Sequence, residues 1–211
     1  MGKKFIFFDP QTKIQFMKNK YFLLRHGESL KNVKNFESCW PEKIKCPLTK
    51  KGRKEIGVAS KRLKTKKINL IFTSDLLRAK QTAEIIGKAL NLEPKLDKRL
   101  REINIGILNG RPIDEIGKFW DREGKLSPLQ YYQKRFKLAV PRGETYSEVE
   151  KRLSDFIKET NKKYKGKNIL IVSHQRPLTL LQKIVHDYNL KKFVKIIMEK
   201  KEIKIGELRK L

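Results

Sequence analysis

Tyr21–Asn32, YFLLRHGESLKN, joins an apolar run to a polar turn. Its first four residues are apolar or aromatic, which predicts a short buried strand. Arg25 and His26 then stand at the carboxyl end of that strand, the rim where open α/β sheets bind ligands. Gly27 would let backbone N–H groups approach an anion, and the planar guanidinium of Arg25 matches phosphate geometry. A strand-end histidine is also often purely structural, so this stretch alone leaves both interpretations open.

Two further runs predict buried strands in the same sheet. Ile68–Phe72 and Asn168–Val172 are apolar, and helical patterns separate them from each other and from the first run. This alternation implies βαβ crossovers, so we expect a doubly wound, three-layer α/β/α sandwich with a mainly parallel central sheet. Because His174 comes just after the last run, it repeats the strand-end placement of His26.

Capping residues and apolar spacing predict the other elements. Helices are expected, in chain order, from Thr49 to about Leu63, after Thr73–Asp75, over Pro112–Trp120, over Ser127–Phe136, from a capping box at Thr145 and Glu148, and around Pro177. The side chains of Thr73–Asp75 are expected to cap the helix that follows them. Phe193–Met198 and Glu202–Ile205 are expected to be closing strands.

The chain is strongly basic for its length of 211 residues. It has 51 Lys and Arg against 23 Asp and Glu, a net charge of +28. Such a field attracts anions, including phosphorylated metabolites, nucleic acids and anionic membranes. The basic residues are scattered, and the sequence has no zinc-finger spacing, aromatic RNA-binding block or basic heptads. We therefore expect no specific nucleic-acid partner, although nonspecific contact would fit the charge.

The remaining composition points to one cytoplasmic domain. Cys39 and Cys46 lack neighbours that would complete a metal site, so we expect reduced thiols. No signal-peptide pattern and no apolar run of membrane-spanning length occur, so we predict a cytoplasmic protein without membrane contact. Residues 1–20 form an N-terminal extension that could fold as a β-hairpin.

Five motifs together resemble the signatures of one family. They are RHGES with Asn32, TSDLLRAKQTAE, LREINIGILNG, PRGETYSEVEKRL and IVSHQ, in that order from about Tyr21 to Leu181. This series resembles the histidine phosphatase superfamily, the phosphoglycerate mutase-like proteins. The resemblance implies one domain over residues 21–211, with a short helical insert around residues 105–140 that shapes specificity. Gln175 departs from the glycine usual after the second histidine, although the bisphosphatase branch shares it.

The resemblance also implies roles for particular residues. His26 would attack phosphorus when its ring is neutral, and Glu102 would protonate the leaving alkoxide and then deprotonate the attacking water. The catalytic residues so implied are Arg25, His26, Arg78, Glu102 and His174, and the substrate-binding residues are Gly27, Glu28, Ser29, Asn32 and Arg142. Arg142 is at least as consistent with an ordinary helix-start loop. The third histidine, His186, lies beyond the motifs and is taken as structural.

No metal or other cofactor is implied, because the arginines and the second histidine supply positive charge. The sequence also lacks an H-E-x-x-H motif and a phosphate-binding GxxxxGK loop. The first hypothesis is a metal-independent phosphomonoester hydrolase acting through phosphohistidine on a small phosphorylated metabolite. A 2,3-bisphosphoglycerate-dependent phosphoglycerate mutase is the second, although the short insert argues mildly against it. A noncatalytic member that binds anions, nucleic acid or protein is the third.

Overall fold

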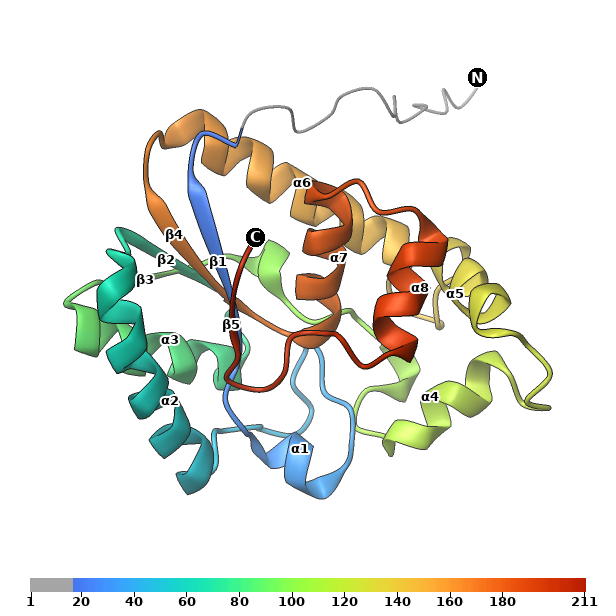
Figure 1. Ribbon diagram of the computed structural model, residues 1–211. Helices are drawn as coiled ribbons and strands as arrows, with labels where there is room; N and C mark the ends of the chain where they lie inside the picture. The colour runs from blue at the N-terminus through green and yellow to red at the C-terminus, as the bar shows by residue number, and fades with distance from the viewer. Residues whose placement is uncertain (1–16) are drawn as a thin grey trace, which may run out of the picture.

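The computed structural model, which describes residues 17–211, is built on a five-stranded sheet with the order β3-β2-β4-β1-β5 (Figure 1). Its strands are β1 (Lys20–Arg25), β2 (Leu70–Thr73), β3 (Pro94–Leu96), β4 (Asn168–Ser173) and β5 (Leu208–Lys210). The neighbours β1 and β4, β4 and β2, and β2 and β3 pair in parallel, whereas β5 runs antiparallel beside β1. The mainly parallel sheet is therefore confirmed. The hairpin expected before residue 17 lies outside the described residues.

Helices cover both faces of this sheet. The pair α2 (Lys50–Leu63) and α3 (Leu77–Leu90) packs on one face, and α6 (Tyr146–Lys163) and α7 (Gln175–Val185) pack on the other (Figure 1). The other helices are α1 (Leu30–Lys34), α4 (Ile113–Trp120), α5 (Pro128–Lys137) and α8 (Leu190–Met198), with 3-10 turns at Lys64–Lys66, Lys98–Leu100 and Gly106–Leu108. The expected three-layer α/β/α arrangement is confirmed.

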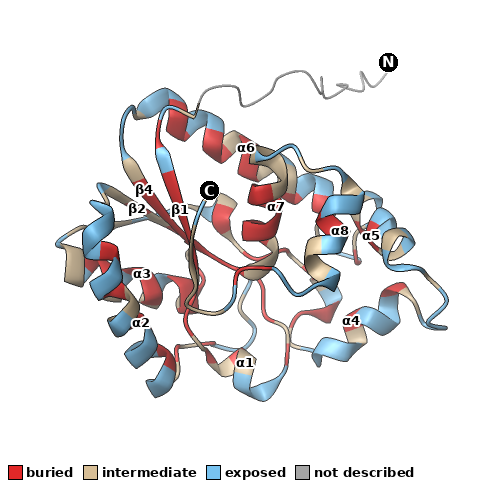
Figure 2. Ribbon diagram, viewed as in Figure 1, coloured by how far each residue is buried: buried red, intermediate tan, exposed pale blue. Residues whose placement is uncertain are grey.

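Strand β1 shows why its apolar run places it in the middle layer. Phe22 and Leu24 join the apolar cluster that contains side chains of α2 and α3. Tyr21 and Leu23 join the cluster that contains side chains of α6 and α7. Successive side chains of a strand point to opposite faces, so a strand covered on both faces must be apolar at nearly every position. Figure 2 accordingly shows the central strands largely buried.

The predicted helix starts are partly correct. Thr49 caps α2 by accepting a hydrogen bond from the N–H of Gly52 at 2.9 Å, and Thr145 caps α6 in a capping box. The prediction that Thr73–Asp75 caps α3 is wrong, because Leu76 is the N-cap and has no side-chain capping bond. Instead Glu42, from a distant loop, accepts a hydrogen bond from the N–H of Leu77 at 3.1 Å. A tertiary contact thus supplies the cap.

The two predicted closing strands are also wrong. The first overlaps α8, which Asn189 caps by accepting a hydrogen bond from the N–H of Lys192 at 2.9 Å. Leu190, Phe193, Val194 and Ile197 then pack on the core, a helical spacing that outweighs the β-propensity of the segment. Glu202–Ile205 is not a strand, and the closing strand is β5, beyond it.

The parallel pairing brings the ends of three strands to one edge. Arg25, the last residue of β1, lies opposite Ser173, the last residue of β4, and Thr73 of β2 lies opposite Val172. The backbone N–H of His26 donates to the carbonyl of Ser173 at 3.1 Å. The residues that follow these strands therefore lie side by side.

Candidate active site

His26 and His174 form the centre of the site at this edge. Both side chains are almost completely buried, and their ring centroids lie 5.2 Å apart. Nδ1 of His26 lies 2.8 Å from the carbonyl oxygen of Gly27, which can only accept, so Nδ1 carries the proton. Nε2 of His26 is then the unprotonated nitrogen, and Nε of Arg78 donates to it at 3.2 Å. The tautomer thus leaves Nε2 with its lone pair available.

Both histidine rings are held neutral. Burial lowers the pKa of His26 well below its ordinary value, and the charges of Arg78 and Arg25 lower it further. The pKa of His174 is lowered well below its ordinary value by burial, by Arg78 and by His26. Because two arginines surround uncharged rings, the site attracts anions without protonating its histidines.

Arg78 is fully buried and its guanidinium is fixed by a loop that precedes α2. Nη2 donates to the carbonyl of Ser38 at 2.8 Å, and Nη1 donates to the carboxylate of Glu42 at 3.1 Å. Glu42 therefore pairs with Arg78 and also accepts from the start of α3. The structure buries this arginine completely because these partners satisfy its charge.

Two polar atoms at the site are buried without a partner in the described part of the chain. They are Nε of Arg25 and Nδ1 of His174, whose other ring nitrogen lies 2.9 Å from the hydroxyl of Ser74. Buried polar atoms are nearly always hydrogen-bonded in folded proteins, so we expect these two atoms to bind a ligand or water. Here both atoms belong to residues expected to contact phosphate.

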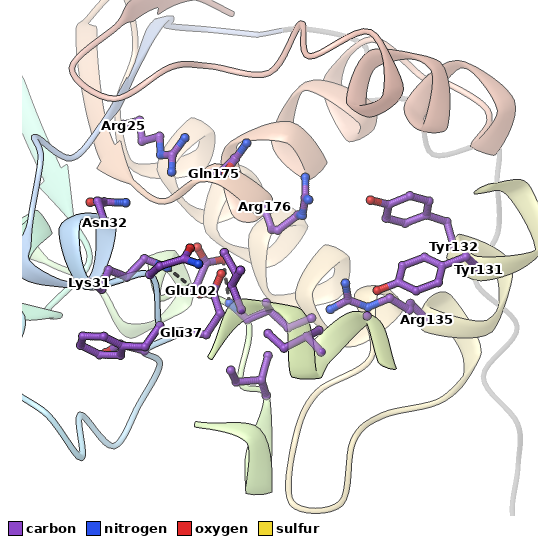
Figure 3. Close-up of a pocket in the computed structure, with 18 residues that line it drawn as sticks. Arg25, Lys31, Asn32, Glu37, Glu102, Tyr131, Tyr132, Arg135, Gln175 and Arg176 are labelled. Atoms are coloured by element: carbon purple, nitrogen blue, oxygen red, sulfur yellow. Dashed lines mark hydrogen bonds and ion pairs between the residues drawn. The ribbon is translucent and has the colours of Figure 1, made fainter. Parts of the chain in front are cut away.

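A cavity of about 380 Å³ opens at this edge (Figure 3). Arg25 and Gln175, the sequence neighbours of His26 and His174, line it, whereas the two histidines do not. Arg25 and Asn32 line one end, and Tyr131 and Arg135 of the insert line the other. Glu102 also lines the cavity and is 8% exposed, so its carboxyl group is within the pocket but screened from bulk solvent. The cavity therefore joins the expected phosphate residues to the expected specificity insert.

The structure places the other expected substrate-binding residues differently. The N–H of Gly27, expected to face an anion, donates to the Thr82 hydroxyl at 3.1 Å, and a Cβ there would lie 2.7 Å from a side-chain carbon of Ile56. Gly27 is thus required for close packing on α2. Glu28 accepts from the Thr49 hydroxyl at 2.8 Å and lines a different hollow.

Ser29, Asn32 and Arg142 complete the expected set. Ser29 is buried and caps α1, where the side-chain oxygen of Asn32 accepts from both its N–H and its hydroxyl. Asn32 therefore lies at the cavity in a fixed orientation. Arg142 is exposed, has a left-handed φ of 64°, and does not line the cavity, which agrees with its interpretation as a loop residue.

Sequence reasoning missed several residues of the site. The cavity is also lined by Lys31, Ser38, Tyr131, Tyr132, Arg135 and Arg176, and Glu42 lies behind Arg78. Arg176 comes two residues after His174, the second motif histidine, which was an available signal. Tyr131 and Arg135 occupy successive turns of a helix, but nothing in that pattern shows that their side chains face the site.

Cys39 and Cys46 are buried free thiols. Within residues 17–211, no helix is both long and apolar enough to cross a membrane. Over the same range, no three His, Cys, Asp or Glu side chains are grouped so that they could hold a metal ion. His186 is exposed and stacks on Tyr188, away from the other two histidines.

Fold and site together define an α/β protein with a two-histidine, two-arginine anion site at the carboxyl edge of a parallel sheet. The chain belongs to the histidine phosphatase superfamily, whose branch 1 family model matches residues 21–210. The family, the fold and the class of enzyme predicted from the sequence, a phosphatase or phosphoglycerate mutase of this superfamily, are thereby confirmed.

Named relatives and solved structures agree with this membership. The chain is 32% identical over 166 residues to the "Probable phosphoglycerate mutase GpmB" of Yersinia enterocolitica, covering 76% of this chain and 71% of the relative. It is similar to Bacillus stearothermophilus YhfR, with 31% identity, 83% of each chain covered and a TM-score of 0.70. A mycobacterial glucosyl-3-phosphoglycerate phosphatase complexed with VO3 shares the fold at 21% identity, with 92% of each chain covered and a TM-score of 0.74.

Proposed function

We propose that the chain is a phosphomonoester hydrolase that acts through a phosphohistidine on His26. The observation that carries this proposal is the hydrogen bond between Nδ1 of His26 and the Gly27 carbonyl, since it leaves Nε2 as the nucleophilic nitrogen. A nitrogen nucleophile must be unprotonated, and the lowered pKa of His26 supports that state. The substrate class is a small phosphorylated metabolite that fits the cavity of about 380 Å³.

In the first step Nε2 of His26 attacks phosphorus and the bond from phosphorus to the ester oxygen breaks. The N–H of Arg78 that donates to Nε2 in the free protein must then turn to a phosphoryl oxygen, because Nε2 no longer has a free lone pair. We propose that Arg25 and Asn32, which line the cavity, and His174, whose ring lies 5.2 Å from that of His26, hold the equatorial oxygens, where charge resides in the transition state. Hydrogen bonds from the arginines thus stabilise the negative charge of the phosphoryl group, as water does for the free ester.

Glu102 is the candidate proton donor. Its carboxyl group lines the cavity beside the phosphoryl position, so it can give a proton to the leaving alkoxide. In the second step the resulting carboxylate takes a proton from water as that water attacks phosphorus. The bond between phosphorus and Nε2 breaks, inorganic phosphate leaves, and both His26 and Glu102 return to their starting states.

A mutase is the alternative that a specific observation favours. Several relatives that are 32% identical carry the name "Probable phosphoglycerate mutase GpmB". The same phosphohistidine would serve both reactions, and the difference is whether water or a substrate hydroxyl receives the phosphoryl group. A noncatalytic anion-binding member is the remaining alternative, and the complete set of candidate catalytic residues argues against it.

The test is phosphate release from a panel of phosphorylated metabolites in the presence of EDTA, with phosphoglycerate interconversion assayed in parallel. We expect release by the wild-type protein and a loss of about 1,000-fold or more in His26→Ala. His186→Ala is the matched control, because it removes the exposed histidine, and it should release phosphate at the wild-type rate. Interconversion with little release would favour the mutase, and neither activity would favour the noncatalytic alternative.

A further inference from the structure

The charges around the cavity are unevenly paired. Four basic side chains line it: Arg25, Lys31, Arg135 and Arg176. The ammonium of Lys31 lies 2.5 Å from the carboxylate of Glu37, and Arg176 pairs with Glu202. No carboxylate within residues 17–211 forms an ion pair with Arg25 or Arg135. Among the described residues that line the cavity, Arg25 and Arg135 are thus cations without an ion-pair partner, and Arg25 also feels the charges of Glu102 and Glu202.

Arg135 is the less expected of the two, because it is buried. Only 8% of the residue is exposed, and its guanidinium lies 4.6 Å from the ring centroid of Tyr146 and 5.9 Å from that of Trp120. Aromatic faces attract a cation but do not replace the carboxylate partner that buried arginines usually have. Its polar partner is the hydroxyl of Tyr131, which carries no charge because burial raises the pKa of that tyrosine (Figure 3).

The two unpaired cations lie at opposite ends of the cavity (Figure 3). Arg25 is at the end where the phosphoryl group would meet His26, and Arg135 is on α5 at the other end. Ile103, Ile105 and Ile116 also line the wall and offer no hydrogen bonds from their side chains. A ligand that neutralises both cations must carry an anionic group at each end.

We infer that Arg135 is a specificity residue that binds a second anionic group of the substrate. The substrate class is then a phosphomonoester with a carboxylate or second phosphate remote from the phosphate that is removed. This inference rests on the proposed function, and it adds the requirement for the second charge. A guanidinium donates paired hydrogen bonds to either group, so both chemistries fit one residue.

Matched substrate pairs test the inference. 3-Phosphoglycerate and glycerol 3-phosphate differ in having a carboxylate or a hydroxymethyl group at the far end, and fructose 1,6-bisphosphate and fructose 6-phosphate differ by the second phosphate. We expect wild-type kcat/KM to favour one of the doubly anionic partners by about 10- to 100-fold, the range of a charge-assisted hydrogen bond. The pair that shows the preference identifies carboxylate or phosphate as the second group.

Arg135→Gln should bring this ratio to within about threefold of unity, chiefly by lowering kcat/KM for the doubly anionic partner. Arg122→Gln is the matched control, because it removes an exposed arginine of the same insert that does not line the cavity, and it should keep the wild-type ratio. Arg135→Lys keeps the charge and should keep part of the preference.

Two results would overturn the inference while the proposed function stands. One is a wild-type protein that releases phosphate from both members of each pair equally well. The other is an Arg135→Gln protein that is folded by circular dichroism but loses activity equally on both members, which would make Arg135 structural. Absence of release from every ester would instead reject the proposed function and this inference together.

Discussion

His26 and His174 are neutral because the fold surrounds buried imidazole rings with arginines. Burial is the largest cause of their lowered pKa values, and Arg78 is the next for both. The same neighbours that keep Nε2 of His26 unprotonated can bind the phosphoryl oxygens, so one arrangement serves both nucleophile and transition state. Glu42 fixes the position of Arg78 in this arrangement by accepting a hydrogen bond from its guanidinium.

These lowered pKa values predict a pH dependence of stability. The unfolded chain protonates both histidines below their ordinary pKa of 6.5, whereas the folded protein keeps them neutral. The unfolded state therefore binds more protons, and the free energy of unfolding should fall below pH 6.5 by up to about 1.4 kcal/mol per pH unit for each ring. Urea titrations at pH 7 and 5.5 measure this fall.

Variants assign that fall to the two rings. His26→Asn and His174→Asn should each lose less stability between pH 7 and 5.5 than the wild-type protein does. His186→Asn, which alters the exposed ring, should lose as much as the wild-type protein. If all four proteins show the same slope, the buried rings are not held neutral.

At the scale of elements, the contact between the β1–α1 turn and α2 depends on Gly27. Gly27→Ala should reduce the free energy of unfolding by about 1–3 kcal/mol, because the new Cβ would overlap Ile56. Gly57 is the matched control, since it lies inside α2 and a Cβ there meets nothing within 4 Å. Gly57→Ala should stabilise the protein by about 0.5–1 kcal/mol, and thermal unfolding separates the two signs. Equal effects at both positions would contradict this account of Gly27.

The central elements could be predicted from the sequence, because each carries its own local signal. The apolar run before His26 specifies a strand covered on both faces, and the Thr145 capping box specifies the start of α6. The α3 cap could not be predicted, since it comes from Glu42, 35 residues away in the chain. The strand predicted over α8 is wrong because Val194, Ile196 and Ile197 favour a strand locally, whereas the Asn189 cap and packing on the core favour a helix.

The candidate site shows the same division between local and tertiary information. The motifs pointed to Arg25, His26, Arg78, Glu102 and His174. In the structure Arg25 and Glu102 line the cavity, Arg78 donates to His26, and the rings of His26 and His174 lie 5.2 Å apart. The role of Arg135 could not be predicted from the sequence around it. It depends on the absence of a carboxylate partner, which only the tertiary structure shows. Arg142 lies in a motif that implied substrate binding, but the structure places it on an exposed loop.

At the scale of the whole molecule, the net charge of +28 should speed the encounter with anionic substrates. We expect kcat/KM to fall several-fold between about 20 mM and 300 mM KCl, because salt screens charges over roughly 10 Å at 0.1 M. A more highly charged ester should show the steeper fall. Initial rates at substrate concentrations well below KM provide the measurement, and a kcat/KM that is independent of salt would show that the charge does not steer substrate.

The central claim is that a phosphoryl group is transferred to His26. The most direct measurement is rapid quenching of the enzyme with a ³²P-labelled substrate, followed by testing the labelled protein in acid and in alkali. Phosphohistidine is labile in acid and stable in alkali, whereas phosphoserine and aspartyl phosphate are not stable in alkali. We predict label with this behaviour in the wild-type protein and His186→Ala and none in His26→Ala. Label that persists in His26→Ala, or that survives acid, would contradict the account.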